Sequence, residues 1–343
     1  MKKIIGYLII AAIVFGGIVA WMYVGSTTAF EGNSESFVIS AEKNNATDVV
    51  ALLKEKKIIS NGFAFSLLAN QFHIWDKLKP GKFEVKKGAN LVDIARMLRS
   101  NRQVSVKLII NKIRTTQDLA DLLAKNFDFD AQYAYNYLTN NDSLQKFGVT
   151  AETLFTIIIP NTYEFYYNAS LTKILFKIKA YSNSFWEQEN RIELAANMGF
   201  TPSEVYTIAS IVEEETNKTS DKGKIASVYI NRLHKGMPLQ ADPTIRFALD
   251  DFTIKRVLEG HLKVNSPYNT YKNQGLPPGP VCTPSSNTIN EVLHAPTTDY
   301  IFFVAKADFS GYSNFSNNFA QHVQYANEYR KALDVYLANK QSK

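Results

Sequence analysis

Three neighbouring glutamates are the residues best suited to acid–base chemistry in this sequence. They are Glu213, Glu214 and Glu215, in the stretch ASIVEEET. Adjacent carboxylates repel one another, so three in a row at the end of an apolar run suggest that one of them has a chemical role. At 100° per residue along a helix, Glu215 shares the apolar face with Ile208 and Ile211. Glu214 falls at the border of that face, and Glu213 points to the opposite side.

The apolar face has a consequence for the acidity of Glu215. A carboxyl group there is penalised when it ionises, so its pKa should rise. A raised pKa keeps a proton available near neutral pH, as a general acid requires. The alternative is that Glu215 simply reaches water from the helix end, although a negative charge there opposes the helix dipole. The other two glutamates are expected to remain solvated.

The helix that presents these glutamates has a clear beginning. Thr201 is placed as an N-cap, Pro202 at the first helical position and Glu204 as the partner in a capping box. These signals predict a helix from Pro202 to about Thr216. A second amphipathic helix should follow and end before Gly236.

The elements beyond this pair can be placed more coarsely. Asp242 followed by Pro243 predicts the start of a third helix, with Asp242 as its N-cap. The Pro-, Gly- and Asn-rich stretch 266–288 is too long for an ordinary connection and is expected to be a functional loop. The run DYIFFVAKADF predicts a buried strand, and an amphipathic helix is expected from about Phe319.

Composition excludes several classes of protein. The chain has 343 residues, 45% of them hydrophobic, and a net charge of +6. Its cations are scattered, so nucleic-acid binding is not expected. The five histidines lack the spacing of common metal sites, and no GxSxG motif marks a serine hydrolase. The single cysteine, Cys282, cannot form a disulfide within the chain.

The N-terminal segment predicts where the rest of the chain lies. Residues from Ile4 to Val24 carry no charge and are almost wholly apolar, which is long enough to cross a bilayer as a helix. A cleaved signal peptide is the alternative, but its apolar core is usually shorter. Lys2 and Lys3 should stay in the cytoplasm, which sends the body of the chain outside.

A weak repeat follows the predicted anchor. Segments that begin at Phe37, Phe83 and Leu108 each read as a short strand, a polar turn and an amphipathic helix. Each helix should carry an aspartate in its first turn, where a negative charge suits the helix dipole: Asp48, Asp93 and Asp118. The copy from Phe83 loosely resembles a LysM-like module, a class that binds peptidoglycan glycans. Generic α+β scaffolding is the alternative.

Several motifs together resemble one family. ASIVEEET, KIASVYINRL, GMPLQADPT, SPYNTY, GLPPGPVCTPS and HAP…DYIFFVA occur in the order and spacing of the YceG-like (MltG) endolytic murein transglycosylases, between Glu204 and His322. The chain departs from that pattern at Phe155 and Thr156, where the family has Glu-Gly. It also has Asn161 in place of an aspartate and Ser313 in place of a histidine.

The resemblance implies an enzyme, a carbon–oxygen lyase that needs no cofactor and no metal. It would cleave the MurNAc–GlcNAc bond of nascent glycan strands, leave 1,6-anhydro-MurNAc ends and so terminate strand elongation. Glu215 stands at the family's catalytic position. Tentative substrate-binding residues lie in or beside the same motifs: Glu213, Gln240, Asp242, Thr244, Asn269 and Tyr271. The alternatives are a non-catalytic, membrane-anchored peptidoglycan-binding protein and an ordinary hydrolytic glycosidase.

The expected fold class is α+β, divided as follows: a cytoplasmic stub (1–3), a transmembrane helix (4–24), a LysM-like α/β region (25–127) and a mixed α+β catalytic domain (128–343). The expected location is the cytoplasmic membrane, as a single-pass protein with its body outside. Peptidoglycan strands are the expected partners, together with penicillin-binding proteins of the cell-wall synthesis machinery.

Overall fold

The computed structural model describes residues 10, 13, 16–17, 20–21 and 23–341. It is a mixed α+β structure, as expected. Most of the predicted anchor, Ile4–Val24, and the stub before it lie outside the described residues. Within the part of the chain that is described, no helix is both long enough and apolar enough to cross a membrane.

The chain forms two compact units. The first runs up to residue 108 and includes 123–130 and 164–170, and the second comprises 109–122, 131–163 and 171–343. The boundary expected between residues 127 and 128 stays a prediction.

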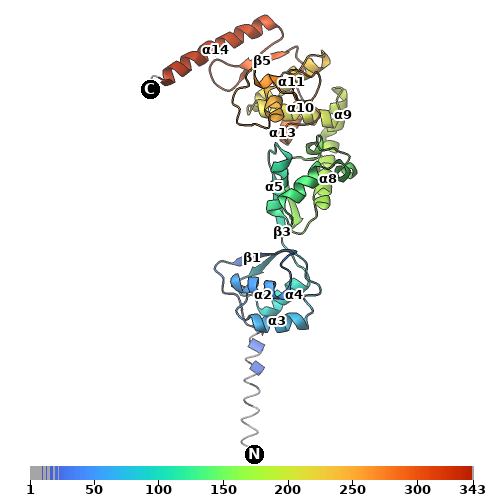
Figure 1. The fold of residues 1–343 in the computed structure, drawn as a ribbon, viewed down its shortest axis with the longest axis vertical. Coiled ribbons are helices and arrows are strands. Elements are labelled where there is room, and N and C mark those ends of the chain that lie inside the picture. The colour runs from blue at the N-terminus through green and yellow to red at the C-terminus, as the bar shows by residue number, and fades with distance from the viewer. Residues whose placement is uncertain (1–9, 11–12, 14–15, 18–19, 22, 342–343) are drawn as a thin grey trace, which may run out of the picture. The chain divides into compact units, whose positions relative to one another are not determined.

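Helices packed on a two-stranded sheet build the first unit. Its elements are β1 (Ser34–Ile39), α2 (Ala46–Glu55), α3 (Gly62–Gln71), β2 (Gly81–Lys86) and α4 (Leu91–Arg99). β1 and β2 pair antiparallel with Ser34 opposite Lys86 (Figure 1). The rings of Phe37 and Phe83 stack across this pair with centroids 5.7 Å apart, inside the core of the unit.

The threefold strand–turn–helix pattern is confirmed. β1 leads to α2, β2 leads to α4, and β3 (Ser105–Ile110) leads to α5 (Thr116–Asn126). Each helix begins with a polar side chain that accepts the backbone N–H of the aspartate three residues on, and the pairs are Asn45–Asp48, Asn90–Asp93 and Thr115–Asp118. The first-turn aspartates therefore contribute to the caps as well as to the dipole. The LysM-like assignment stays a prediction.

The chain after α5 is mostly helical. Its elements are α6 (Ala131–Thr139), α7 (Asn141–Leu144), η1 (Gln145–Phe147), η2 (Leu154–Ile157), β4 (Asn161–Tyr166), α8 (Leu171–Glu187), η3 (Gln188–Asn190), α9 (Arg191–Asn197), α10 (Pro202–Glu215), α11 (Thr219–His234), α12 (Asp242–Ala248), η4 (His261–Lys263), α13 (Ser286–Leu293), β5 (Phe302–Ala305), β6 (Ser313–Ser316) and α14 (Phe319–Gln341). β4 pairs with β3, and β5 pairs antiparallel with β6.

The centre of the second unit is α10. It packs on α11, α12 and α13 (Figure 1), and its residues from Val205 to Val212 are all buried. Tyr206 has no exposed surface, and its hydroxyl donates to the carbonyl of Ile158 at 2.5 Å. A helix buried on every side over two turns is a rigid support for whatever its last residues carry.

Two expectations for the C-terminal part have different outcomes. The helix predicted from Phe319 is confirmed as α14. The run DYIFFVAKADF was expected to be a buried strand, which is wrong: β5 is only half-buried. Its sheet has only two strands, and adjacent side chains of β5 contact different helices: Phe303 packs on Tyr229 of α11, and Phe302 packs on His322 of α14.

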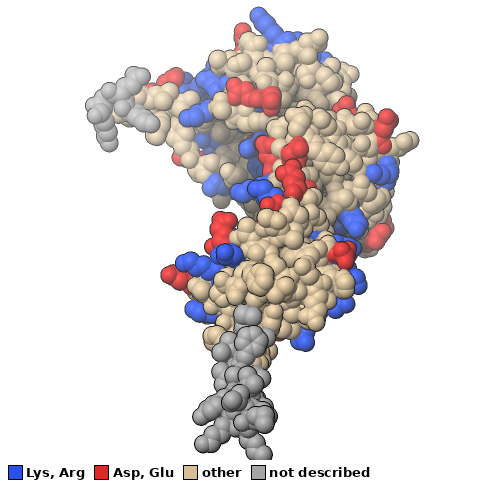
Figure 2. Space-filling view, turned by 60° about the horizontal axis from the view of Figure 1, so that its bottom comes forward, with Lys and Arg blue, Asp and Glu red and all other residues tan. Residues whose placement is uncertain are grey.

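Charged side chains of both signs are scattered over the face in Figure 2, without an extended patch of one sign.

Candidate active site

Glu215 is the last residue of α10, at the point where the buried helix reaches a pocket. The helix starts as expected, because Thr201 accepts from the backbone N–H of Glu204 while the Glu204 carboxylate accepts from the N–H of Thr201. It ends at Glu215, and Thr216 is already extended. The predicted helix is therefore confirmed to within one residue.

The carboxyl group of Glu215 has one direct partner among the hydrogen bonds of the described residues. The hydroxyl of Tyr229, on α11, donates to Oε1 at 2.6 Å. Burial raises the pKa of Glu215 to about 7, and the charges of Asp242 and Glu214 act in the same direction. The Tyr229 hydrogen bond and the charge of Arg246 oppose this rise. The expected elevation of the pKa is thus present, and its main cause is loss of hydration.

The pocket at Glu215 has a volume of about 280 Å³. It is lined by Glu215, Arg232, Leu239, Gln240, Asp242, Tyr271, Phe303 and His322. The sequence placed Gln240, Asp242 and Tyr271 near the catalytic residue through the family resemblance, and these three do line the pocket. Arg232, Phe303 and His322 were not among the expected site residues. Tyr229 and Arg232 are three residues apart on α11, so a helical reading of KIASVYINRL could have paired them.

A second carboxylate, Asp242, shares the pocket with Glu215. The hydroxyl of Tyr271 donates to its Oδ1 at 2.6 Å. The expectation that Asp242 is an N-cap is wrong: α12 begins at Asp242 itself, and its N-cap is Ala241, which has no side chain to accept a bond. The side chain of Asp242 therefore does not cap α12, and it lines the pocket instead. Gln240, just before it, has φ of +53°, a conformation that costs energy for a residue with a side chain.

Arg232 and His322 are the basic side chains among the residues that line this pocket. Arg232 donates to the carbonyl of Leu239 at 2.8 Å and to the side chain of Gln240 at 3.3 Å, and so fixes the loop before α12. His322, on α14, stacks on Phe302 with centroids 4.9 Å apart. Its Nδ1 is buried and has no partner in the described structure. Burial, and then the charge of Arg232, lower the pKa of His322, and both effects favour the neutral form of the ring.

The expectation that the other two glutamates are solvated is wrong. Glu213 accepts from Lys222 at 2.9 Å, from Ser285 at 3.2 Å and from Thr288. Burial alone would raise the pKa of Glu213, but the hydrogen bonds from Thr288 and Lys222 and the Lys222 charge bring it below its usual value. Helix periodicity did place Glu213 opposite Glu215, but it could not show that α11 and α13 cover that side.

Glu214 is held by cations from the segment before α5. Arg114 donates from Nε and Nη2 to its two oxygens, each at 3.1 Å, and Lys112 lies 3.1 Å from Oε1. Such a forked pair orients both groups. Glu213 and Glu214 therefore anchor the end of α10, and Glu215 is left to face the pocket.

Three of the tentative binding residues serve the scaffold. Glu213 is outside the pocket lining, in the network just described. Thr244 has no exposed surface, and its hydroxyl donates to the carbonyl of Ala241 at 2.7 Å. Asn269 is also fully buried and donates to the carbonyls of Leu262 and Val264 at 2.9 and 2.8 Å. Thr244 and Asn269 therefore stabilise the loops beside the pocket, and neither side chain lines the pocket.

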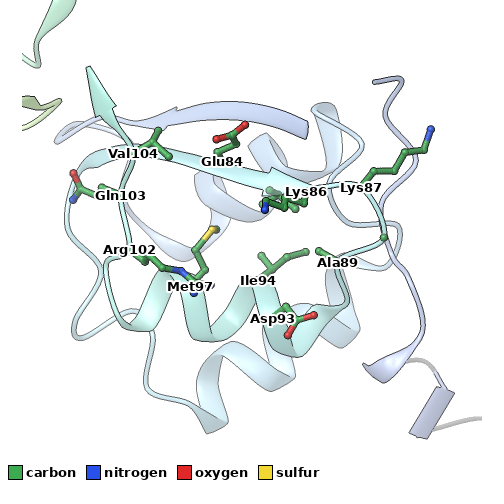
Figure 3. A pocket seen from close by; sticks show the side chains of 12 residues that line it. Glu84, Lys86, Lys87, Ala89, Asp93, Ile94, Met97, Arg102, Gln103 and Val104 are labelled. Carbon is green, nitrogen blue, oxygen red and sulfur yellow. The ribbon is translucent and has the colours of Figure 1, made fainter. Parts of the chain in front are cut away.

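A larger hollow, of about 630 Å³, belongs to the first unit (Figure 3). It lies between β2 and α4, with Met97 and Ile94 on one side and Lys86 and Arg102 at its ends. Its two carboxylates already have partners, because Glu84 accepts from Ser34, and Asp93 caps α4. Its groups suit binding better than acid–base chemistry.

Comparison with known proteins now decides the family. The sequence profile of the YceG-like family matches residues 38–328. The chain belongs to this YceG-like family. A protein of Bacillus subtilis strain 168 named endolytic murein transglycosylase is 31% identical over 301 residues, which is 88% of this chain and 73% of that protein. The match to the family profile thus covers most of the residues that the structure describes in this YceG-like chain.

Two further relatives are more distant. A protein of Streptococcus pneumoniae serotype 2, strain D39, with the same name is 27% identical over 353 residues; the match spans 93% of this YceG-like chain but 63% of the pneumococcal protein, less than two thirds of it. A crystal structure of a YceG-like protein from Listeria monocytogenes superposes with a TM-score of 0.55 at 25% identity, over 85% of this chain and 99% of that one.

Proposed function

We propose that this chain is an endolytic murein transglycosylase, an enzyme of peptidoglycan, and that Glu215 is its catalytic acid and then its base. The observation that carries the proposal is the position of Glu215: a carboxyl group with a pKa near 7, in a pocket, at the end of a helix that its neighbours hold rigidly. Relatives named endolytic murein transglycosylase support the same reaction.

The reaction can proceed with one carboxyl group. Protonated Glu215 gives its proton to the glycosidic oxygen as the bond from C1 of MurNAc breaks. The resulting carboxylate then removes the proton from the C6 hydroxyl of the same sugar, whose oxygen attacks C1. The products are a 1,6-anhydro-MurNAc end and a free GlcNAc hydroxyl. No water is consumed, and Glu215 returns to its protonated state.

The Tyr229 hydroxyl has a clear part in this cycle. It donates to Oε1 and so stabilises the carboxylate that exists between the two proton transfers. Asp242, held by Tyr271, adds negative charge to the same pocket, which would favour the positive charge that develops at C1 in an oxocarbenium-like transition state.

A hydrolytic glycosidase is the second candidate, because Asp242 lines the same pocket as Glu215. Hydrolases of this kind use a second carboxylate to activate water or to attack C1. The two mechanisms give different products: hydrolysis adds one water to each cleaved bond, and the anhydro reaction adds none.

The first test is the variant Glu215→Gln. The amide is nearly isosteric, so the fold should remain, while cleavage of glycan strands should fall by about 10²–10⁴-fold because the only proton carrier is lost. The matched control is Glu204→Gln, which changes a capping carboxylate at the other end of α10 and should leave the rate within a small factor. Wild-type activity in Glu215→Gln would remove Glu215 from the mechanism.

We also propose a location and partners. Residues Ile4–Val24 would form a single membrane anchor with its N-terminus inside, so that the described body lies outside the cytoplasm, near penicillin-binding proteins that make the strands. The uncharged length of this segment and the Lys2–Lys3 pair support the orientation. The first unit would bind glycan in a LysM-like manner, for which its β1–α2–α3–β2 order and its separate hollow are the support.

A further inference from the structure

Helix α3 leaves two large apolar side chains in solvent. Phe63 is 75% exposed and Leu67 is 49% exposed, although the same helix buries Ala64, Phe65 and Leu68 in the core of the first unit. Phe63 and Leu67 are four residues apart, so they lie next to each other on one face of the helix. The two form a small apolar face that no other described element covers.

A lysine borders this face. From Lys56 to Trp75 the sequence contains no aspartate or glutamate. Lys54, on α2, borders the same shallow hollow as Phe63 and Ser66. An apolar face whose only charged neighbour in this hollow is a lysine suits a surface of anionic lipid headgroups over acyl chains.

The start of α3 is also where the chain arrives from its apolar N-terminal segment. The Thr27 hydroxyl accepts the backbone N–H of Ser60 at 3.0 Å, and the N–H of Ala29 donates to the carbonyl of Lys57 at 2.8 Å. In Figure 1, α3 lies at the end of the first unit that residues 23–25 enter. Val24, just before these contacts, is 66% exposed.

We propose that the outer face of α3, formed by Phe63 and Leu67, lies on the lipid bilayer and holds the first unit against the membrane surface. This inference rests on the proposed anchor, because the anchor brings the start of α3 to the headgroup region. Phe63 and Leu67 would enter the boundary between headgroups and acyl chains, and Lys54 would remain among the headgroup phosphates.

The test uses the full chain reconstituted in vesicles that contain anionic phospholipid. Single-cysteine variants Phe63→Cys, Val38→Cys and Trp21→Cys carry an environment-sensitive thiol dye. Val38 is the matched control, because it is apolar and 37% exposed but lies on β1, at the other end of the same unit. The native Cys282 has no exposed surface, so the parent chain should take up little dye.

The expected result is quenching of the dyes at positions 63 and 21 by spin-labelled lipid, several-fold stronger than at position 38. Iodide in the aqueous phase should quench in the opposite order. If lipid quenches position 21 but not 63, the inference about α3 is wrong and the anchor stands. If it quenches neither, the anchor fails, and the inference fails with it.

A second copy of the chain is the other occupant that could cover this face. In that case the dye at position 63 would be shielded from iodide in detergent micelles without a bilayer, and the shielding would grow with protein concentration. That outcome would contradict a membrane contact.

Discussion

Glu215 differs from its two neighbours in the charge of its partners. Glu213 is paired with Lys222, and Glu214 with Arg114 and Lys112. Among the described residues Glu215 has no ion pair, and its hydrogen-bond donor is the neutral hydroxyl of Tyr229. A cation in direct contact would favour the carboxylate and lower the pKa. Without one, burial dominates, and the proton is retained near neutral pH.

The pH dependence of cleavage follows from this proton. Catalysis begins with protonated Glu215, so kcat/KM should fall as the pH rises through about 7, the pKa of that group. The measurement is the pH profile of glycan cleavage. A rate that keeps rising with pH from 6 to 9 would contradict the role of Glu215 as the acid.

The same pKa has a consequence for stability. It is raised in the folded state, so the protonated carboxyl stabilises the fold fully below about 4.5 and this contribution is lost as the pH rises through about 7. Glu215→Gln cannot ionise. Its free energy of unfolding should therefore exceed that of the wild type by about 1–3 kcal/mol at pH 8, and the gap should close at pH 4. Denaturant unfolding at the two pH values measures this difference.

The hydroxyl of Tyr229 should set the position of the pH profile. Its hydrogen bond favours the carboxylate, so Tyr229→Phe should raise the pKa of Glu215 and move the falling limb upward by about 1 pH unit. Loss of the stabilised carboxylate intermediate should also lower the maximal rate. Tyr271→Phe, which removes the bond to Asp242 instead, is the matched control. An unmoved limb in Tyr229→Phe would show that the hydroxyl does not act on Glu215.

At the scale of elements, the end of α10 is fixed by its neighbours on two sides. Lys222 on α11 and Thr288 on α13 bind Glu213, and Arg114, before α5, binds Glu214. These bonds restrain the last turn of the helix and so determine where Glu215 points. A single acid–base group works only when its carboxyl is held at the correct position relative to the substrate, and these bonds hold Glu215 in one position.

Removal of the Lys222 cation should destabilise the fold, because this cation pairs with Glu213 at the end of α10. Lys222→Met leaves the carboxylate of Glu213, whose side chain is only 14% exposed, without its cation. The free energy of unfolding should fall by about 2–4 kcal/mol. The double variant with Glu213→Gln should recover part of it, and Lys235→Met, at an exposed site, should change little. Equal stability of Lys222→Met and the wild type would mean that the pair does not fix α10.

Local signals explain what could be foreseen from the sequence. The capping residues of α10 and the aspartates of the three strand–turn–helix units act within four residues, so their positions were predictable. The partners of Glu213 come from residues 9 and 75 positions away along the chain. Periodicity gives the direction of a side chain but not the element that covers it. Asp242 shows the same limit: a shift of one residue at the start of α12 turns an expected cap into a pocket residue.

At the scale of the whole molecule, the proposal places both units outside the cytoplasm. A reporter that works only outside should be active when it is fused after Lys343, because in the proposed orientation Lys2 and Lys3 would keep the N-terminus inside. A reporter that works only in the cytoplasm serves as the control at the same position. Activity of the cytoplasmic reporter there would contradict the orientation.

The central claim is that this chain cleaves glycan strands without water, through Glu215 alone. The most direct measurement is digestion of peptidoglycan strands in water enriched in heavy oxygen, followed by mass spectrometry of the fragments. The account predicts fragments with 1,6-anhydro-MurNAc ends, each lighter by one water than a hydrolysis product and free of heavy oxygen. Fragments with reducing ends that carry heavy oxygen would contradict it and would establish hydrolysis at this site.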